Sequence, residues 1–509
     1  MISLKPLFLL LLLLPISGFA QGGGAGRVTG EVLIKFRAGT AVEASRGVIL
    51  NKGGITLERF AGLGWERVKL PKGKSVEQAI ADFTGSAVVE AVQPNYYYHL
   101  LATPNDPSYG SLWGMAKISA PQAWDLSTGS SSVVVADIDT GIKYDHPDLA
   151  ANVWTNSGEI NGNGIDDDNN GFVDDFYGYD FFFNDPNPLD ENGHGTHTAG
   201  TIGAAGNNGV GVAGVNWNVK IMAIKIYDND GLGTTSAMLI NAYNYVLMMK
   251  NRGVNIRVTN NSYGGCDEAC GYDQATKDAI DALGRAGVLQ VFAAGNDGLN
   301  IDTSPQYPAA YHSPWIISVA NSTSSDVRNG SSNFGVVNVD LAAPGTSILS
   351  TINGGSGYGT LSGTSMATPH VAGAAALLSA YDPNLSTASL KATFLNTVDQ
   401  LPAWNGVVKT GGRLNVAAAL QNKTVCSFSV PSSTIDLPTK GGYFTINVTA
   451  AANCDYQVKS NANWIRLTTV DSLSGNGTAT FRATLNPTIS RSGTIDIGGT
   501  TVTVIQSRS

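Results

Sequence analysis

Ser365 lies in a run of small residues (GTSMA) that leads into a nearly apolar segment, residues 366–379. This composition predicts a buried helix with the serine at its N-terminal end. Unpaired backbone N–H groups and the positive end of the helix dipole meet there, an arrangement that favours a developing oxyanion. A serine in this position is more often a helix N-cap than a nucleophile, so Ser365 alone does not indicate an enzyme.

Three further residues supply what a serine nucleophile needs. His194 lies between two glycines and is the candidate general base for the hydroxyl. Asp139 follows an apolar strand pattern and is the candidate acid that orients the imidazole. Asn296 follows another apolar strand pattern and offers a side-chain amide to an oxyanion, beside the Ser365 backbone N–H. The four residues predict acyl transfer through a serine nucleophile.

His194 and His197 also permit a second interpretation. Two histidines three residues apart can share one face of a helix and bind a metal ion. The sequence around them has neither an HExxH pattern nor an evident third ligand. We therefore expect one histidine to be catalytic and the other structural, with a zinc-dependent hydrolase as the alternative.

A substrate-binding edge is predicted after the strand pattern at residues 256–259. Ser262, Tyr263 and Gly264 follow that strand. An extended segment in such a place can pair with a peptide through main-chain hydrogen bonds.

An acidic, glycine-rich stretch at residues 156–190 predicts a calcium site. The side chains that fall on positions one, three, five and nine of a calcium-binding loop are Asp166, Asp168, Asn170 and Asp174. Position twelve is Tyr177 instead of glutamate. The alternative is a solvated loop without an ion, but closely spaced carboxylates repel one another unless a cation or solvent neutralises them.

Composition and the N-terminus indicate an exported protein. The chain has 509 residues and a formal net charge of −9, which argues against nucleic-acid and anionic-membrane partners. Lys5, an apolar run at residues 7–14 and small residues before Gln21 predict a signal peptide, residues 1–20. A membrane anchor is the alternative, but the run is too short to span a bilayer comfortably.

The four cysteines favour disulfides in an exported chain, and four allow three pairings. Proximity in the sequence favours Cys266 with Cys270 and Cys426 with Cys454. The second bridge would join the first strand of the C-terminal region to a later one.

The pattern of predicted elements gives an α/β fold. Strand patterns at residues 132–138, 219–226, 256–259, 288–293 and 315–320 alternate with helical ones, notably residues 273–286. This alternation predicts a mainly parallel sheet with helices on both faces. Residues 27–101 predict a small α+β unit, and short alternating strands from about residue 424 predict a small β-sandwich with a Gly498–Gly499 hairpin turn.

Four of these motifs together resemble the subtilases, the subtilisin-like serine endopeptidases. They are DTG at Asp139, HGTH at His194, AGN at Asn296 and GTSMA at Ser365, and the similarity covers about residues 104–423. The resemblance implies Asp139, His194 and Ser365 as a catalytic triad, Asn296 in the oxyanion hole and a substrate edge at residues 262–264.

The resemblance has further implications. Residues 21–101 resemble an inhibitory propeptide that assists folding, with cleavage between residues 98 and 103. Asp148 and Asn208 match positions that help bind structural Ca²⁺ in subtilisins, although the loop around Asn208 carries one extra residue. The expected product is a secreted monomer, with residues 102–423 as its catalytic domain and protein or peptide substrates.

Residues 424–509 resemble a BACON-type immunoglobulin-like domain through Asn463-Trp464-Ile465, Arg491-Ser492-Gly493 and the terminal VIQ. Such domains are thought to bind carbohydrate or glycoprotein. A rival function for the whole chain is a catalytically silent binding protein, against which the complete set of catalytic motifs argues.

Overall fold

The computed structural model describes residues 27–96, 102–264, 271–486 and 489–507. The chain divides into two compact units, Met1–Leu100 and Leu101–Ser509, and each is described by itself. Three predictions fall wholly or largely outside the described residues: the signal peptide, the propeptide cleavage point and the Cys266–Cys270 bridge.

The first unit is the predicted small α+β fold. Its antiparallel sheet has the order β2-β3-β1-β4, with two helices. The elements are β1 (Arg27–Phe36), α1 (Val42–Asn51), β2 (Ile55–Phe60), β3 (Trp65–Lys69), α2 (Val76–Thr84) and β4 (Val89–Tyr96). A capping box starts α2: the Ser75 hydroxyl accepts from the Gln78 N–H, and the Gln78 side chain accepts from the Ser75 N–H.

The second unit is built on a nine-stranded sheet of order β14-β15-β11-β10-β9-β8-β5-β7-β6. All neighbouring pairs are parallel except β14 with β15, which confirms the mainly parallel sheet. The strands are β5 (Gly129–Asp139), β6 (Gly178–Asp180), β7 (Asn218–Lys225), β8 (Ile256–Asn261), β9 (Leu289–Ala293), β10 (Ile316–Ser322), β11 (Leu341–Pro344), β14 (Asp399–Gln400) and β15 (Gly412–Arg413).

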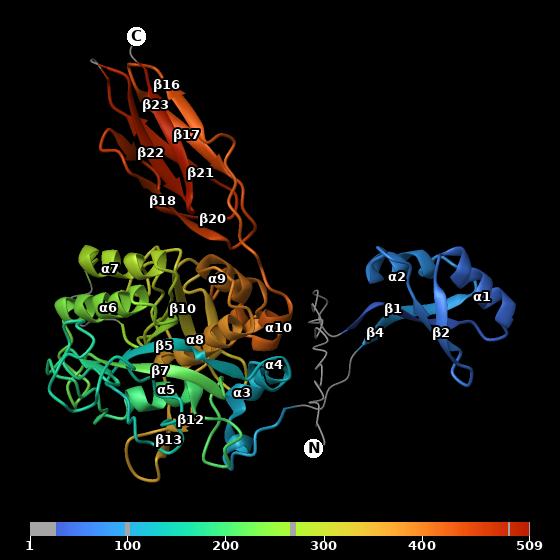
Figure 1. The fold of residues 1–509 in the computed structure, drawn as a ribbon, viewed down its shortest axis with the longest axis horizontal. Coiled ribbons are helices and arrows are strands. Elements are labelled where there is room, and N and C mark those ends of the chain that lie inside the picture. Colours follow the sequence, from blue (N-terminus) through green and yellow to red (C-terminus); the bar gives the residue numbers. More distant parts are fainter. Residues whose placement is uncertain (1–26, 97–101, 265–270, 487–488, 508–509) are drawn as a thin grey trace, which may run out of the picture. The chain divides into compact units, whose positions relative to one another are not determined.

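Alternate side chains of the central strand β5 enter two different hydrophobic cores. Val133 and Val135 belong to the core with α5 (His194–Gly203) and α8 (Thr364–Tyr381). Val134, Ala136 and Ile138 belong to the core with α6 (Ser236–Asn251) and α7 (Gln274–Arg285). Figure 1 shows α6 and α7 on one side of β5 and β7, and α5 on the other. The sheet is therefore covered on both faces, as its apolar strands require.

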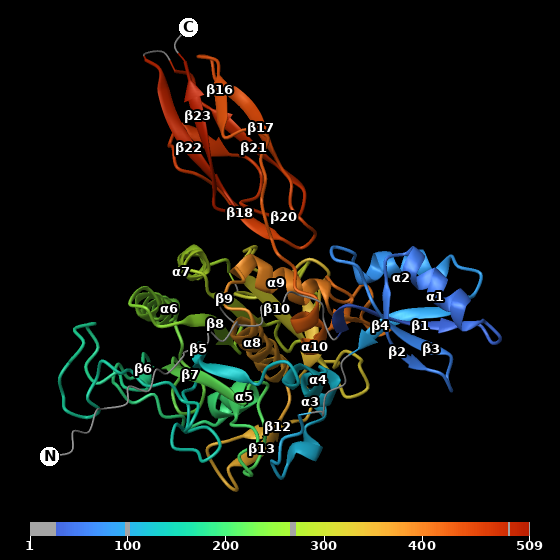
Figure 2. The ribbon, with the colours of Figure 1, turned by 45° about the vertical axis from the view of Figure 1, so that its right-hand side comes forward.

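Short elements complete this layer. The hairpin of β12 (Ile348–Thr351) and β13 (Tyr358–Leu361) is antiparallel, and Figure 2 shows it below α5. The remaining helices are η1 (Tyr109–Ser111), α3 (Trp113–Lys117), α4 (Ala120–Trp124), α9 (Thr387–Asn396), η2 (Pro402–Trp404) and α10 (Val416–Gln421). Within the described ranges, no helix combines the length and apolar character needed to cross a membrane.

The C-terminal region is a β-sandwich with one core between a five-stranded and a three-stranded sheet (Figure 2). Its strands are β16 (Thr434–Leu437), β17 (Gly442–Val448), β18 (Asp455–Ser460), β19 (Ile465–Leu467), β20 (Ser472–Ser474), β21 (Gly477–Ala483), β22 (Arg491–Ile497) and β23 (Thr500–Gln506). The predicted Gly498–Gly499 turn joins β22 to β23, and both glycines have positive φ, as a two-residue hairpin turn requires.

The Cys426–Cys454 disulfide is confirmed, with Cα atoms 5.5 Å apart. It does not join two strands as predicted. Cys426 lies in the irregular segment after α10, and Cys454 directly precedes β18. The bridge therefore fixes the entry of the chain into the sandwich.

Candidate active site

Asp139 and His194 meet at the carboxyl end of the parallel sheet. Asp139 is the last residue of β5, and His194 is the first residue of α5. Asp139 Oδ1 lies 2.6 Å from His194 Nδ1, and it also accepts the Thr140 N–H at 2.8 Å. The carboxylate is buried, with 2% of its side chain exposed, whereas 29% of the His194 side chain is exposed. A buried acid thus orients an imidazole whose other nitrogen remains accessible.

This pairing changes the proton affinity of His194. Burial of the ring disfavours its charged form, but the charge and hydrogen bond of Asp139 outweigh burial and raise the pKa of His194 above its usual value. The imidazole is therefore a stronger base than a free histidine, as expected of a group that must take a proton from a hydroxyl.

Asp190 holds the start of α5 and was not singled out from the sequence. Its Oδ1 accepts the backbone N–H groups of Asn192 and Gly193 and the hydroxyl of Thr140. Its Oδ2 accepts the backbone N–H and hydroxyl of Thr196. A carboxylate at a helix N-terminus satisfies unpaired donors and complements the dipole. An aspartate shortly before the helix that carries His194 was the available signal.

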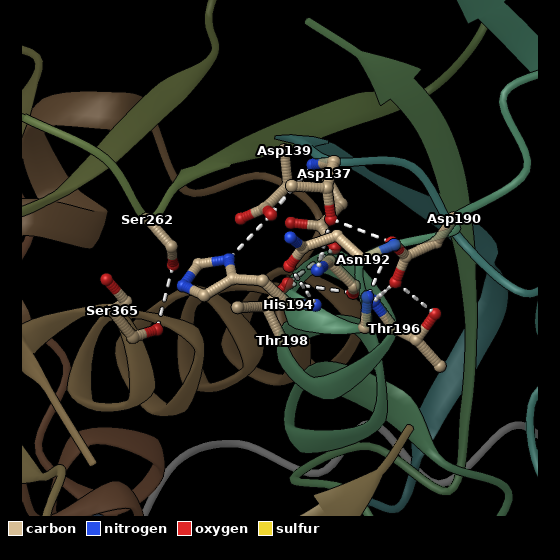
Figure 3. A network of polar contacts seen from close by, with 12 residues as sticks. Asp137, Asp139, Asp190, Asn192, His194, Thr196, Thr198, Ser262 and Ser365 are labelled. Atoms are coloured by element: carbon tan, nitrogen blue, oxygen red, sulfur yellow. Dashed lines mark hydrogen bonds and ion pairs between the residues drawn. The ribbon is translucent and has the colours of Figure 1, made fainter. Parts of the chain in front are cut away.

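Ser365 lies in the first turn of α8 rather than before it, because the helix begins at Thr364. The N-cap is Gly363, and no side chain caps it, so Ser365 is not the N-cap. Every other residue of α8 from Thr364 to Ser379 is buried, whereas Ser365 is only partly buried. Figure 3 shows the His194 ring with Asp139 on one side and Ser262 and Ser365 on the other.

The backbone carbonyl of Ser365 is bound by a side chain instead of by its helix. Pro369 lies four residues after Ser365 and has no N–H to donate to that carbonyl. The hydroxyl of Ser262, which directly follows β8, donates to the Ser365 carbonyl at 2.9 Å. Pro369 therefore lies beyond the first turn of α8, and Ser262 supplies the hydrogen bond that the helix itself lacks.

Asn296 is held by one end of its amide and free at the other. Its Oδ1 accepts the Thr364 backbone N–H at 2.9 Å and the Thr364 hydroxyl at 3.1 Å. A Cβ built on Gly363 would lie 3.6 Å from both Asn296 Nδ2 and Oδ1, so the amide group lies beside the residues before Ser365. Within the described part of the chain Nδ2 has no hydrogen-bond partner, and it can donate to a ligand beside Ser365.

The backbone before Asn296 needs a glycine. Gly295 has a φ of +100°, and a Cβ there would lie 2.3 Å from Asn333 Nδ2. A larger residue would displace the loop that positions Asn296.

Comparison with known proteins assigns the family. Residues 130–412, more than half of the chain, match the subtilase family. The chain belongs to the subtilase family. A further match joins residues 15–95 to the fervidolysin N-terminal prodomain.

Similar proteins agree with this assignment. Thermitase of Thermoactinomyces vulgaris is 39% identical over 320 residues, which cover 63% of this chain and 99% of thermitase. A thermophilic serine proteinase of Bacillus sp. (strain AK1) is 33% identical over 389 residues, or 76% of this chain and 86% of that protein. A solved protease from Pseudoalteromonas arctica has 31% identity and a TM-score of 0.51, covering 63% of this chain and 99% of its own. This subtilase is a serine-type peptidase with an N-terminal prodomain.

The predicted substrate edge of the subtilase continues from β8. The side chain of Ser262 binds the Ser365 carbonyl, and the Tyr263 hydroxyl bonds to Asn261 Oδ1 and the Tyr243 hydroxyl. Over the described residues, the backbone of Tyr263 and Gly264 makes no hydrogen bond with another backbone segment. These main-chain groups are free to pair with a peptide.

His197 has the structural role expected for one of the two histidines. Its ring is buried, and Nε2 lies 2.8 Å from the Ile348 carbonyl of β12. Burial lowers the pKa of His197 to about 4, so the ring is neutral.

The acidic stretch of the subtilase brings together three carboxylates, of which the sequence pattern named one. Ligand atoms of Glu159, Asp168 and Asp175 lie within 4.8 Å of one another. Among the described residues Asp168 Oδ1 accepts no hydrogen bond, but it forms an ion pair with Arg252 Nη2 at 3.2 Å. Burial together with the charge of Asp168 raises the pKa of Asp175 to about 6. Such a set of hard oxygen donors fits a calcium ion.

The other residues of the predicted loop have different partners. The Asp166 carboxylate accepts backbone N–H groups of Asn170 and Gly171, and the Asp174 carboxylate accepts those of residues 162–164. Asn170 Nδ2 donates to Asp175 Oδ2 at 2.9 Å. These residues shape the loop around the three carboxylates.

The second predicted calcium pair is also brought together. Asn208 Nδ2 donates to Asp148 Oδ1 at 2.8 Å, and the Val212 N–H donates to Asp148 Oδ2 at 2.9 Å. Burial raises the pKa of Asp148 above its usual range. A nearby cation would favour its charged form.

Proposed function

We propose that this subtilase is a secreted endopeptidase whose triad is Asp139, His194 and Ser365. Ser365 Oγ attacks the carbonyl carbon of a peptide bond while His194 Nε2 takes the hydroxyl proton. Asp139 stabilises the imidazolium that forms. The amide of Asn296 and the backbone N–H of Ser365 bind the oxyanion. His194 then protonates the leaving amine, and water hydrolyses the acyl-enzyme by the reverse sequence of proton transfers.

The 2.6 Å contact between Asp139 and His194 carries this proposal. It aligns the imidazole toward Ser365, the one incompletely buried position in the first sixteen residues of α8. The free main-chain groups of Tyr263 and Gly264 support an extended peptide as the ligand, with Ser262 binding the Ser365 backbone.

Hydrolysis of casein and of peptide anilides tests the assignment. We expect wild-type protein to cleave both, and Ser365→Ala to lower kcat by about 10⁶-fold, as loss of a serine nucleophile does in this class. A wild-type rate in the Ser365→Ala variant would overturn the proposal. Inhibition by a zinc chelator, but not by serine-directed reagents, would instead favour the metal-dependent alternative at His194 and His197.

We further propose that residues 21–101 are an inhibitory propeptide, removed by cleavage between residues 98 and 103. The match of residues 15–95 to a prodomain supports this role. Mass spectrometry of the mature protein should give a new N-terminus in that interval. A mature chain that still begins near residue 21 would contradict removal.

We also propose that the protein is secreted and that its chain divides into four segments. The signal-like residues 1–20 support export, and the domains are residues 1–20, 21–101, 102–423 and 424–509. The mature protein acts as a monomer, which sedimentation of the Ser365→Ala protein can check.

Calcium is the structural ion that we propose for this enzyme. Glu159, Asp168 and Asp175 would hold one ion, with Asp166, Asn170 and Asp174 ordering their loop. Asp148 and Asn208 would contribute to a second site. The ions would neutralise clustered carboxylates and take no part in the reaction.

The C-terminal sandwich is proposed to be a BACON-type domain that binds carbohydrate or glycoprotein. Arg491 lies over the Trp464 ring, 4.3 Å from its centroid, and a surface hollow beside this ring is lined by Asn461 and Asn463. An aromatic ring with adjacent amides suits a sugar face and its hydroxyls. Glycan-array binding by residues 424–509, lost in Trp464→Ala, would support this role, and no binding would reject it.

A further inference from the structure

Asp137 is a fully buried carboxyl group that the proposed mechanism does not use. It lies on β5 two residues before Asp139, so both side chains project from the same face of the strand. That face also carries Val133 and Val135, which pack in the core with α5 and α8. An isolated ionised carboxylate in such a place is costly, so the group needs partners or a proton.

Its partners come from the two elements on either side. The Asn260 amide of β8 donates to Asp137 Oδ1 at 2.8 Å. Asp137 Oδ2 lies 2.9 Å from the hydroxyl of Thr198 on α5. The charged groups that face Asp137 are Asp139 on its own strand and His194 on α5.

The two contacts of the Thr198 hydroxyl favour a proton on Asp137. The Thr198 hydroxyl lies 2.9 Å from Asp137 Oδ2 and also 2.9 Å from the Gly195 carbonyl, but it has one hydrogen. Both contacts are hydrogen bonds if Asp137 is protonated and donates to Thr198 Oγ1, while Thr198 donates to Gly195. Burial, reinforced by the nearby charge of Asp139, raises the pKa of Asp137 well above its usual range and agrees with this arrangement.

The network continues to the nucleophile. Asn260 Nδ2 also contacts Ser262 Oγ at 3.0 Å, and Ser262 donates to the Ser365 carbonyl. At the other end, Thr198 lies one turn after His194 on α5. A continuous set of hydrogen bonds therefore joins the helix that carries the base to the helix that carries the nucleophile, through Asp137 and Asn260.

We propose that Asp137, as a neutral carboxylic acid, is a positioning residue that fixes His194 relative to Ser365. This inference rests on the proposed catalytic roles of those two residues. A neutral acid supplies a donor and an acceptor at once, so it can link Thr198 to Asn260. It also leaves Asp139 as the one carboxylate charge in contact with the imidazolium.

Asp137→Asn and Asp137→Val test the two parts of this inference. Asparagine has a donor and an acceptor in the same places, whereas valine has neither. We expect Asp137→Asn to keep kcat within about 3-fold of wild type. Asp137→Val should lower kcat per titrated active site by about 10- to 100-fold with KM within about 3-fold, since small misplacements of catalytic groups cost this much.

The pH profile of kcat/KM separates a neutral Asp137 from a charged one. If Asp137 is neutral, Asp137→Asn removes no charge, and the acid midpoint set by His194 stays within about 0.3 pH units of wild type. A fall of more than about 0.5 pH units would show that the wild-type group is ionised and would overturn the assignment. If Asp137 only filled space in the core, Asp137→Asn would not be expected to keep both the acid midpoint of kcat/KM and the kcat of wild type.

Active-site titration with a phosphonate shows whether Asp137→Val folds into a protein with a reactive site. If Asp137→Val yields no titratable protein, Thr198→Val decides, because it removes the linking hydroxyl and keeps the side-chain shape. A kcat per site lowered about 10-fold supports the inference, and a wild-type kcat in either valine variant overturns it. Wild-type protein that neither reacts with the phosphonate nor loses activity in Ser365→Ala would instead refute the proposed function itself.

Discussion

The hydroxyl of Ser262 donates a 2.9 Å hydrogen bond to the backbone carbonyl of Ser365, at the point where Pro369 interrupts the hydrogen-bond ladder of α8. The proline removes the donor that a regular helix would supply, and a residue from the end of β8 takes its place. The strand that leads to the proposed substrate edge is thereby attached to the turn that carries the proposed nucleophile.

This relationship predicts a measurable coupling between Ser262 and Pro369. Ser262→Ala leaves the Ser365 carbonyl without its donor and should lower the free energy of unfolding by about 1 kcal/mol. In a Pro369→Ala background, the new N–H can bond to that carbonyl, so the same substitution should cost close to nothing. Urea unfolding of phosphonate-inhibited protein, which prevents autolysis, measures the four variants. Equal costs in both backgrounds would contradict the compensation.

Asn296→Ala should reduce kcat and leave substrate binding nearly intact. In the proposed mechanism the Asn296 amide donates where charge develops in the transition state, and loss of one such donor typically lowers kcat about 10²- to 10³-fold. KM should change by less than about 3-fold, because the ground-state carbonyl depends little on this donor. Asn300→Ala, further along the same loop, serves as the matched control. A large rise in KM with unchanged kcat would assign Asn296 to ground-state binding.

The activity should fall on the acid side as His194 gains a proton. The pKa of His194 is raised in the folded enzyme, so the acid midpoint of kcat/KM should lie above 6.5, the usual value. Asp139→Ala removes the responsible charge and should move the midpoint down by about 1–3 pH units, while lowering kcat strongly. A midpoint unchanged by this substitution would show that another group controls the acid limb.

The raised pKa of His194 also predicts how the stability of the fold changes with pH. A histidine with a raised folded pKa stabilises the fold below its unfolded pKa, and this contribution is lost as the pH rises through the folded value. The Tm difference between wild type and His194→Gln should therefore be larger at pH 5.5 than at pH 9. An opposite trend would contradict the raised pKa.

Calcium removal should destabilise the enzyme. A chelator should lower the Tm, and added Ca²⁺ should restore it, because the proposed ion would bind the folded state and neutralise neighbouring carboxylates. Glu159→Gln combined with Asp168→Asn should reduce this calcium-dependent shift. Asp145→Asn, an exposed acid whose side chain is 65% exposed, should leave it unchanged. A shift of the same size in all three proteins would place the ion elsewhere.

The candidate site residues that are marked by their immediate sequence neighbours could be predicted. Asp139, His194, Asn296 and Ser365 each lie beside a glycine or small residue at the end of a strand or start of a helix, and such junctions can be recognised without a structure. The alternation of strands and helices likewise predicted the parallel sheet. The helix after Gly363 began two residues earlier than expected, since small polar residues do not mark a helix start clearly.

The supporting residues depend on distances that the sequence does not contain. Asp137 and Asp190 act through contacts across strands and helices, and Glu159 joins Asp168 and Asp175 only after the loop folds back. The calcium-loop pattern named Asp166 and Asp174 because it counts positions, whereas their carboxylates bind backbone amides. The role of Ser262 was not predicted because it depends on a contact between β8 and α8, where the Ser262 hydroxyl replaces the N–H that Pro369 lacks.

The central claim is that Ser365 is the nucleophile activated by His194 and Asp139. Incubation of the mature enzyme with a peptidyl phosphonate, followed by peptide mapping, tests it most directly. We expect one adduct, on the peptide that contains Ser365, with none in Ser365→Ala and slow labelling in His194→Ala. An adduct on a different residue, or equally fast labelling after either substitution, would contradict it.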